Sequence, residues 1–160
     1  MTSDDHFGLS RFVEAQDAGG TYDRAVAELR DGCKGGHWMW FVFPQIAGLG
    51  FSPTAQRYAI SSLDEARAYL AHPVLGPRLI ECAGIVAATE GRTAEQIFGE
   101  IDAMKLRSSA TLFLRAAPQE PVFGQVLGRF FDAEPDPATD RLVGGGRRPD
   151  RGVSDAGSSS

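Results

Sequence analysis

The chain has 160 residues, of which 42% are hydrophobic and 23% charged, with a formal net charge of −5. This length fits a single domain. No apolar run approaches the roughly 20 residues that span a bilayer, and the N-terminus lacks a signal-peptide pattern, so we expect a cytoplasmic chain with no membrane segment. The two cysteines, Cys33 and Cys82, are too few for a disulfide scaffold or a zinc site. The acidic balance argues against extensive nucleic-acid binding by the folded domain.

Helical patterns with start and stop signals recur along the chain. Ser10, Thr21, Ser62 and Thr93 are placed as N-caps, the last with Glu95 and Gln96 behind it in the manner of a capping box. Glycines and prolines mark the helix ends. The predicted helices cover 11–16, 22–30, an aromatic segment ending at Pro44, 63–71, 77–89, a segment opening at Thr93, 101–116 and 122–131.

No alternating strands flank a short glycine or asparagine turn, so no hairpin is predicted. The fold class is therefore all-α, a compact single-domain bundle of about seven to nine short helices. Residues 1–8 are expected to form a flexible N-terminus and 9–143 the helical domain. The glycine-, serine- and arginine-rich stretch 144–160 cannot bury enough apolar surface to offset ordering entropy, so a disordered tail is expected there.

An aromatic segment, His37-Trp38-Met39-Trp40-Phe41-Val42-Phe43, interrupts this ordinary composition. Its apolar run suits a buried strand or a buried helix, and we favour the helix because a lone strand has no partner for its backbone groups. Two interpretations stay open. The aromatic side chains form core, or one tryptophan with Lys34 and His37 forms a stacking platform with an acid/base group at its edge. Both indole N–H groups need partners, so one tryptophan should be only partly buried.

A second cluster lies in the predicted helix 101–116. At 100° per residue, Asp102, Lys105 and Ser109 fall within about 60° of one another, on a face that also carries apolar residues. A charged residue within an apolar stripe must be paired or must face a cavity. The cluster is thus either an ion pair on the surface or part of a polar pocket.

The remaining polar candidates are single residues. Gln45 follows Pro44 and can present its amide to a ligand, while Arg57 and Tyr58 follow a glycine-rich loop and can bind phosphate. Arg78 lies just inside a predicted helix start, where anions are favoured. The histidines and cysteines show no metal-ligand spacing, and no phosphate-loop, dinucleotide or serine-nucleophile motif is present. The sequence therefore predicts neither a metal site nor a cofactor.

Several motifs together resemble one bacterial family of unknown function whose members are often automatically labelled calpastatin. They are Lys34…His37-Trp-Met-Trp-Phe-Val-Phe-Pro-Gln45, Leu63-Asp-Glu-Ala-Arg-Ala-Tyr-Leu-Ala-His-Pro73 and Asp102…Lys105-Leu-Arg-Ser-Ser109. The resemblance covers roughly Leu9 to Val143 and implies a small, mostly helical cytoplasmic protein. We reject the calpastatin label because the chain shows no inhibitory repeat and no long disordered region.

A fainter similarity links the chain to the NADAR-type hydrolases, helical enzymes that act on ADP-ribose-like N-glycosides. It rests on the aromatic segment, on Glu65-Ala66 followed by Leu75-Gly76 and Arg78, and on the helix that carries Lys105. The similarity implies a carboxylate that stabilises an oxocarbenium-like centre, an aromatic surface for a base and cations for phosphates.

The sequence thus predicts a small-ligand-binding helical domain, interpreted as an N-glycoside hydrolase acting on a nucleotide or ADP-ribose-like substrate. The residues leave open whether it is an enzyme, and the alternative is a non-catalytic helical module that binds a protein partner. The candidate catalytic residues are Asp102, Glu65 and His37. The candidate ligand-binding residues are Lys34, Trp38, Trp40, Gln45, Arg57, Tyr58, Arg78, Lys105, Arg107, Ser108 and Ser109. The site is expected between the aromatic segment and the helix containing 102–109.

Overall fold

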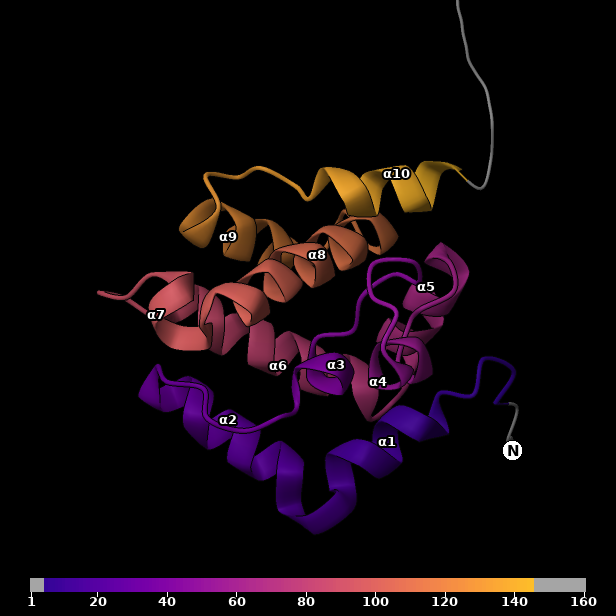
Figure 1. The fold of residues 1–160 in the computed structure, drawn as a ribbon, viewed down its shortest axis with the longest axis horizontal. Coiled ribbons are helices and arrows are strands. Elements are labelled where there is room, and N and C mark those ends of the chain that lie inside the picture. Colours follow the sequence, from indigo (N-terminus) through magenta and orange to yellow (C-terminus); the bar gives the residue numbers. More distant parts are fainter. Residues whose placement is uncertain (1–4, 146–160) are drawn as a thin grey trace, which may run out of the picture.

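A computed structural model describes residues 5–145, which fold as ten α-helices and one 3-10 turn (Figure 1). The α-helices are α1 (Ser10–Asp17), α2 (Thr21–Asp31), α3 (Met39–Val42), α4 (Pro53–Arg57), α5 (Leu63–Ala71), α6 (Leu75–Ala88), α7 (Ala94–Phe98), α8 (Glu100–Ala116), α9 (Pro121–Phe130) and α10 (Pro137–Gly145). The 3-10 turn, η1 (Ala18–Gly20), joins α1 to α2. The all-helical fold class predicted from the sequence is confirmed.

Two helices organise the packing. α8, the longest, packs against α5, α7, α9 and α10, and α6 packs against α2, α5 and α9. In Figure 1, α1 and α2 lie along one side of the molecule and α9 and α10 along the opposite side, with α6 and α8 between them. No helix among residues 5–145 is both long and apolar enough to cross a membrane.

The predicted capping residues are right in two cases and wrong in two. Ser62 accepts a hydrogen bond from the Glu65 backbone N–H, and Thr93 forms the full capping box with Gln96. Ser10 and Thr21, in contrast, are already inside their helices. The start of α1 is capped instead by the carboxylate of Asp5, which accepts from the backbone N–H groups of Leu9 and Ser10.

Two helices were missed. The end of the glycine-rich stretch 48–53 was predicted as a loop and no helix was predicted after it, yet α4 forms there, beginning with the Ser52 cap and Pro53 in its first turn. α10 follows the proline-rich turn and continues to Gly145, two residues into the predicted tail. The rest of that tail, 146–160, and residues 1–4 of the predicted flexible N-terminus lie outside the described residues.

The aromatic segment contributes less helix than predicted. Only Met39–Val42 are helical, and the chain then bends at Phe43 and leads to an isolated parallel bridge between Ile46 and Ile60. This bridge supplies the backbone partner that the sequence did not reveal: Ile60 N–H donates to the Gln45 carbonyl, and Ala47 N–H to the Ile60 carbonyl. It holds the segment after Pro44 beside the segment that follows α4.

One contiguous apolar core fills the space between the helices. It includes Trp38 and Phe43 of the aromatic segment, and Phe113 and Phe123 from α8 and α9, whose rings stack with centroids 5.6 Å apart. Trp40, in contrast, is only partly buried. The two tryptophans therefore have different environments although one residue separates them.

Candidate functional site

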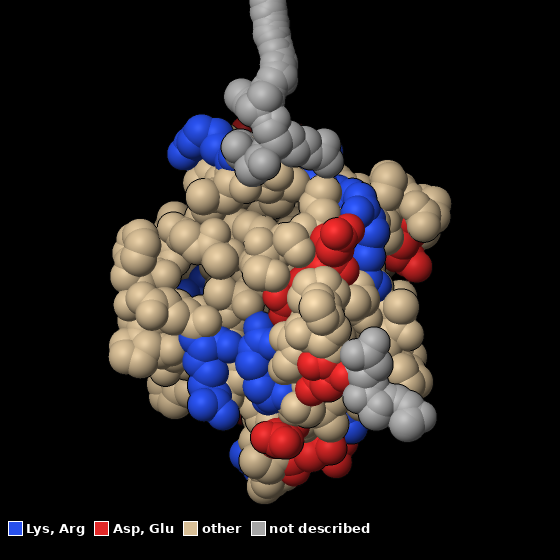
Figure 2. All heavy atoms as spheres, turned by 90° about the vertical axis from the view of Figure 1, so that its right-hand side faces the viewer, with Lys and Arg blue, Asp and Glu red and all other residues tan. Residues whose placement is uncertain are grey.

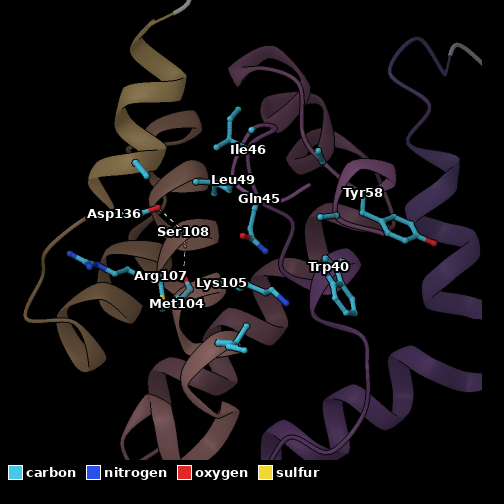
Figure 3. A pocket seen from close by; sticks show the side chains of 16 residues that line it. Trp40, Gln45, Ile46, Leu49, Tyr58, Met104, Lys105, Arg107, Ser108 and Asp136 are labelled. Carbon is cyan, nitrogen blue, oxygen red and sulfur yellow. Dashed lines mark hydrogen bonds between the residues drawn. The ribbon is translucent and has the colours of Figure 1, made fainter. Parts of the chain in front are cut away.

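A cavity of about 410 Å³ opens between α8, the α3 region, the 45–50 loop, α4 and the start of α10 (Figure 3). Its wall is mostly apolar with a few polar side chains. The lining residues from the first half of the chain are Trp40, Gln45, Ile46, Gly48, Leu49, Gly50, Ala55, Tyr58 and Ala59. Those from the second half are Ile101, Met104, Lys105, Arg107, Ser108, Asp136 and Ala138. Pockets of this size and character are typical of small-molecule sites.

The chain has only two lysines, Lys34 and Lys105, and both bind the carboxylate of Asp102. The Lys34 ammonium lies 2.8 Å from Oδ2, and the Lys105 ammonium lies 3.3 Å from Oδ1. The side chain of Lys34 is 7% exposed, whereas those of Asp102 and Lys105 are 20% and 21% exposed. We name these three residues the lysine–aspartate cluster.

Each lysine of this cluster also lies over a tryptophan ring. The Lys105 ammonium is 4.3 Å from the centroid of Trp40, and the Lys34 ammonium is 5.0 Å from that of Trp38. Cations are attracted to the electron-rich face of such rings. Only the Lys105–Trp40 pair lies in the pocket wall, and Figure 3 shows the Lys105 side chain extending from α8 toward Trp40.

The loop that carries Lys34 is held by Glu28 of α2. Glu28 Oε1 accepts hydrogen bonds from the backbone N–H groups of Gly35 and Gly36 and from Nε1 of Trp38. Burial opposes ionisation of this carboxyl, but these bonds and the Lys34 charge outweigh it and lower the pKa of Glu28. The indole N–H of the buried tryptophan thus has its partner, as required.

The opposite wall of the pocket is built by Asp136, which caps α10. Its Oδ2 accepts from the Ser108 hydroxyl at 2.8 Å and from the Thr139 hydroxyl at 2.6 Å. The Asp136 backbone N–H donates to the Thr111 hydroxyl, which ties the start of α10 to α8. Burial works against the charge of Asp136, yet the hydrogen bonds prevail and lower the pKa of its carboxyl. A carboxylate is therefore held in this wall.

The segment before α10 is further fixed by Arg107. Its guanidinium donates to the carbonyl oxygens of Glu134 and Pro135 at 3.0 and 2.9 Å. Beyond it, Leu142 of α10 packs against Gly48, whose φ of +104° suits glycine and where an added Cβ would come within 3.1 Å of the leucine. α10 therefore bridges α8 and the 45–50 loop across the pocket.

The structure places six of the predicted ligand-binding residues in the pocket wall. They are Trp40, Gln45, Tyr58, Lys105, Arg107 and Ser108. Lys34 and Asp102 lie behind that wall, joined to it through Lys105. The Gln45 side-chain amide has no hydrogen-bond partner among the described residues, so it is available to a ligand.

The other candidate residues lie away from the pocket. Glu65 is buried and accepts from Arg11 at 3.0 Å and from the Ser61 backbone and hydroxyl, which gives it a structural role in joining α1 to α5. Arg78 pairs with Asp17 at 2.9 Å and covers the Tyr22 ring.

Arg57, Trp38, His37 and Ser109 are also absent from the wall. Arg57 is exposed beside Tyr58, and His37 is exposed next to the buried Trp38. The Ser109 hydroxyl is buried without a hydrogen-bond partner among the described residues.

Sequence reasoning missed Asp136 and the apolar part of the wall. The signal for Asp136 was present in Asp-Pro-Ala-Thr, an aspartate followed by Pro at the first helical position, which is a typical helix start. Within residues 5–145 no three His, Cys, Asp or Glu side chains gather so that they could hold a metal ion.

Large apolar side chains are exposed around the pocket mouth. Ile101 and Met104 of the wall are 71% and 70% exposed, and Phe51, next to Gly50, is 77% exposed. Figure 2 shows one face of the molecule with a hollow that is rimmed by uncharged residues and has Lys or Arg atoms inside it. The entrance is apolar and the interior carries charge.

Fold and pocket together define a small all-helical domain with a pocket lined by apolar, aromatic and cationic side chains. The chain matches the family described as "Protein of unknown function (DUF1810)" over residues 6–143, and it belongs to that family. It is similar to the crystal structure of the conserved hypothetical protein Rv1873 from Mycobacterium tuberculosis, with 52% sequence identity and a TM-score of 0.84. That similarity covers 87% of this chain and 98% of the other. Among curated proteins, none matches the chain.

Proposed function

We propose that the pocket binds a nucleotide-like small molecule and that the domain hydrolyses the N-glycosidic bond of an ADP-ribose-like substrate. The observation that carries the proposal is the position of Lys105, a cation held 4.3 Å above the ring of Trp40 in the wall of a pocket of about 410 Å³. An aromatic surface, a cation and a free amide in one largely apolar pocket are the groups that a base, a phosphate and a ribose require.

Different side chains of the wall suit the base, the phosphate and the ribose of such a ligand. Trp40 and Tyr58 offer ring faces or edges to a base, and Lys105 offers its ammonium to an anionic group. The Gln45 amide both donates and accepts, so it suits a base edge or a ribose hydroxyl. The faint similarity to NADAR-type hydrolases points to the same ligand class.

Hydrolysis of an N-glycoside breaks the bond between the anomeric carbon and the base nitrogen. The water oxygen bonds to that carbon, and the leaving nitrogen takes up a proton. Positive charge develops on the sugar in the transition state, and a carboxylate stabilises it. We assign this role to Asp102, the predicted catalytic carboxylate that is joined to the pocket wall through its ion pair with Lys105. Glu65 pairs with Arg11 and His37 is exposed, and neither is joined to the pocket wall, so the proposed reaction does not use them.

A thermal-shift panel of NAD, ADP-ribose, nucleotides and nucleosides tests binding. A ligand that binds the native state raises the unfolding temperature, so at least one compound should stabilise the protein. Chromatography of that compound after incubation should then show release of the base. Asp102→Asn should lose this release while still binding, and Asp64→Asn, which alters an exposed carboxylate on α5, should retain it. A flat response across the panel contradicts the proposal.

A second candidate function, a helical module that binds a protein partner, is favoured by the exposed apolar residues at the pocket mouth. Soluble monomers rarely keep a large apolar patch without a use for it. Phe51→Ser and Met104→Gln should then abolish capture of a partner while leaving nucleotide stabilisation intact. If the same substitutions reduce only ligand binding, the mouth serves the pocket and the partner function is wrong.

A further inference from the structure

Lys34 is buried behind the pocket wall, so it does not itself reach a ligand there. Its ammonium donates to the Gly36 carbonyl and pairs with Asp102, and its backbone N–H donates to the Ile97 carbonyl at 2.8 Å. A buried lysine is costly unless its charge is compensated, so its presence needs an explanation.

The net charge of the lysine–aspartate cluster explains why a buried lysine is present. Asp102 alone would cancel the charge of Lys105 and leave a neutral pair at the pocket. Because Lys34 forms an ion pair with the other oxygen of the same carboxylate, the three residues together carry a net charge of +1. Lys105 is the member of the cluster in the pocket wall, so a ligand meets the excess positive charge there.

Other charges nearby act less directly on the pocket. Glu28 interacts electrostatically with Lys34, but no ion pair joins it to either lysine and it does not line the pocket, so a ligand does not meet its charge directly. In the opposite wall, Asp136 and Arg107 carry opposite charges, and Arg107 also lies 3.8 Å from the exposed carboxylate of Glu134, so this wall adds no excess positive charge and Lys105 remains its source.

We propose that Lys34 is a positioning residue that competes for Asp102, leaves the charge of Lys105 uncancelled, and thereby makes the pocket selective for ligands with an anionic group such as a phosphate. This inference deepens the proposed function, on whose pocket it rests. It adds that neutral compounds of the same shape bind more weakly, and that the discrimination depends on a residue that does not touch the ligand.

Selective labelling with [¹³C]lysine makes the test direct, because the chain has only two lysines. The side-chain signals of Lys34 and Lys105 are assigned by substitution, and the protein is titrated with pyrophosphate. The Lys105 signal should shift in a saturable manner, at lower pyrophosphate concentrations when the salt concentration is low. A Lys105 signal that does not move at any pyrophosphate concentration overturns the inference.

A charge series separates this role from a structural one. Lys34→Met should weaken pyrophosphate binding about tenfold, the size expected for one charge several ångströms away at an intermediate dielectric. Asp102→Asn should strengthen binding, and the double variant, again with a net charge of +1, should return toward wild type. Lys34→Arg keeps the charge and should keep the affinity.

Arg129→Met is the matched control, since it removes one positive charge from an α9 residue that contributes nothing to the pocket wall. If Lys34→Met fails to fold, Asp102→Asn still tests the sign of the effect. Affinities that follow the stability of each variant rather than its charge contradict the inference.

The two proposals fail in different ways. If adenosine binds at the pocket but pyrophosphate leaves Lys105 unmoved, the inference about anions is wrong and the nucleotide-like ligand survives. If pyrophosphate shifts Lys105 but no nucleotide or nucleoside stabilises the protein, the anion site stands and the proposed function falls.

Discussion

Two lysine–tryptophan pairs share one aspartate, and they differ in what surrounds them. The Lys34–Trp38 pair is buried, and Glu28 binds the indole N–H at 2.9 Å, so the polar groups of this pair find partners within the chain. The Lys105–Trp40 pair is partly exposed and lines the pocket. We call Lys34–Trp38 the closed pair and Lys105–Trp40 the open pair. The two pairs are chemically similar but differ in their exposure to solvent.

The difference shows how a charged cluster near a core can serve a ligand. A buried ion pair contributes little net stability, because desolvation offsets its attraction. Here the closed pair fixes Asp102, and Asp102 fixes Lys105 over Trp40. Preorganisation of this kind lowers the ordering cost when a ligand binds.

The largest effect is expected in the closed pair. Trp38→Ala should lower the free energy of unfolding by about 3–5 kcal/mol, because it leaves a large cavity in the core and removes one of the three hydrogen-bond donors to Glu28. Urea denaturation measures this change. A loss below about 1 kcal/mol would show that the closed pair is not structural.

In the open pair, substitution should affect ligand binding more than stability. Trp40→Ala should weaken binding of a stacked nucleotide by about 1–3 kcal/mol, the usual contribution of one aromatic stacking partner. Its effect on stability should be much smaller than that of Trp38→Ala, since Trp40 is only partly buried. Calorimetric titration with the best ligand of the thermal-shift panel checks this. Equal affinities of wild type and variant would contradict the distinction between the pairs.

The stability that Glu28 contributes beside the buried Lys34–Trp38 pair should depend on pH. Its carboxyl has a lowered pKa in the folded state, so ionised Glu28 stabilises the fold above its unfolded pKa, and that stability is lost as pH falls through the folded value. Glu28→Gln should cost about 1 kcal/mol at neutral pH, with the difference shrinking below about pH 4. Urea titrations at several pH values measure it. Glu14→Gln, on an exposed face of α1, is the control and should show no such trend.

The smallest effect concerns the two free thiols. Cys33 is exposed beside the buried Lys34, whereas Cys82 is buried and its thiol pKa is raised to about 12 by that burial. Iodoacetamide should therefore alkylate Cys33 in the native protein and Cys82 only after unfolding. Mass spectrometry of the peptides distinguishes the two. Native modification of Cys82 would mean that this part of the core opens.

Much of the fold could be predicted because its signals are local. Ser62, Thr93 and Gly32 mark helix ends by short-range hydrogen bonds and backbone conformation, and the structure shows each of them in that role. α4 was missed because it is five residues long and lies within a glycine- and proline-rich stretch. Such a short helix owes its stability to tertiary contacts rather than to its own pattern.

The site was harder to predict because it depends on contacts between distant segments. Helical spacing predicts that Asp102 and Lys105 share one face, and Lys34 is a candidate because it lies close to the two tryptophans in the sequence. No local pattern could show that Lys34 would bind the same carboxylate, 68 positions away in the sequence. The same limit applies to Asp136, which reaches the pocket only because α10 folds back across α8.

A crystal structure of the protein with ADP-ribose tests the central claim most directly. We expect ligand density in the pocket between α8 and the 45–50 loop, with a ring against Trp40 and a phosphate beside Lys105. Density elsewhere would contradict it, for example in the shallow groove beside Arg30 and Arg92, as would an empty pocket at saturating ligand.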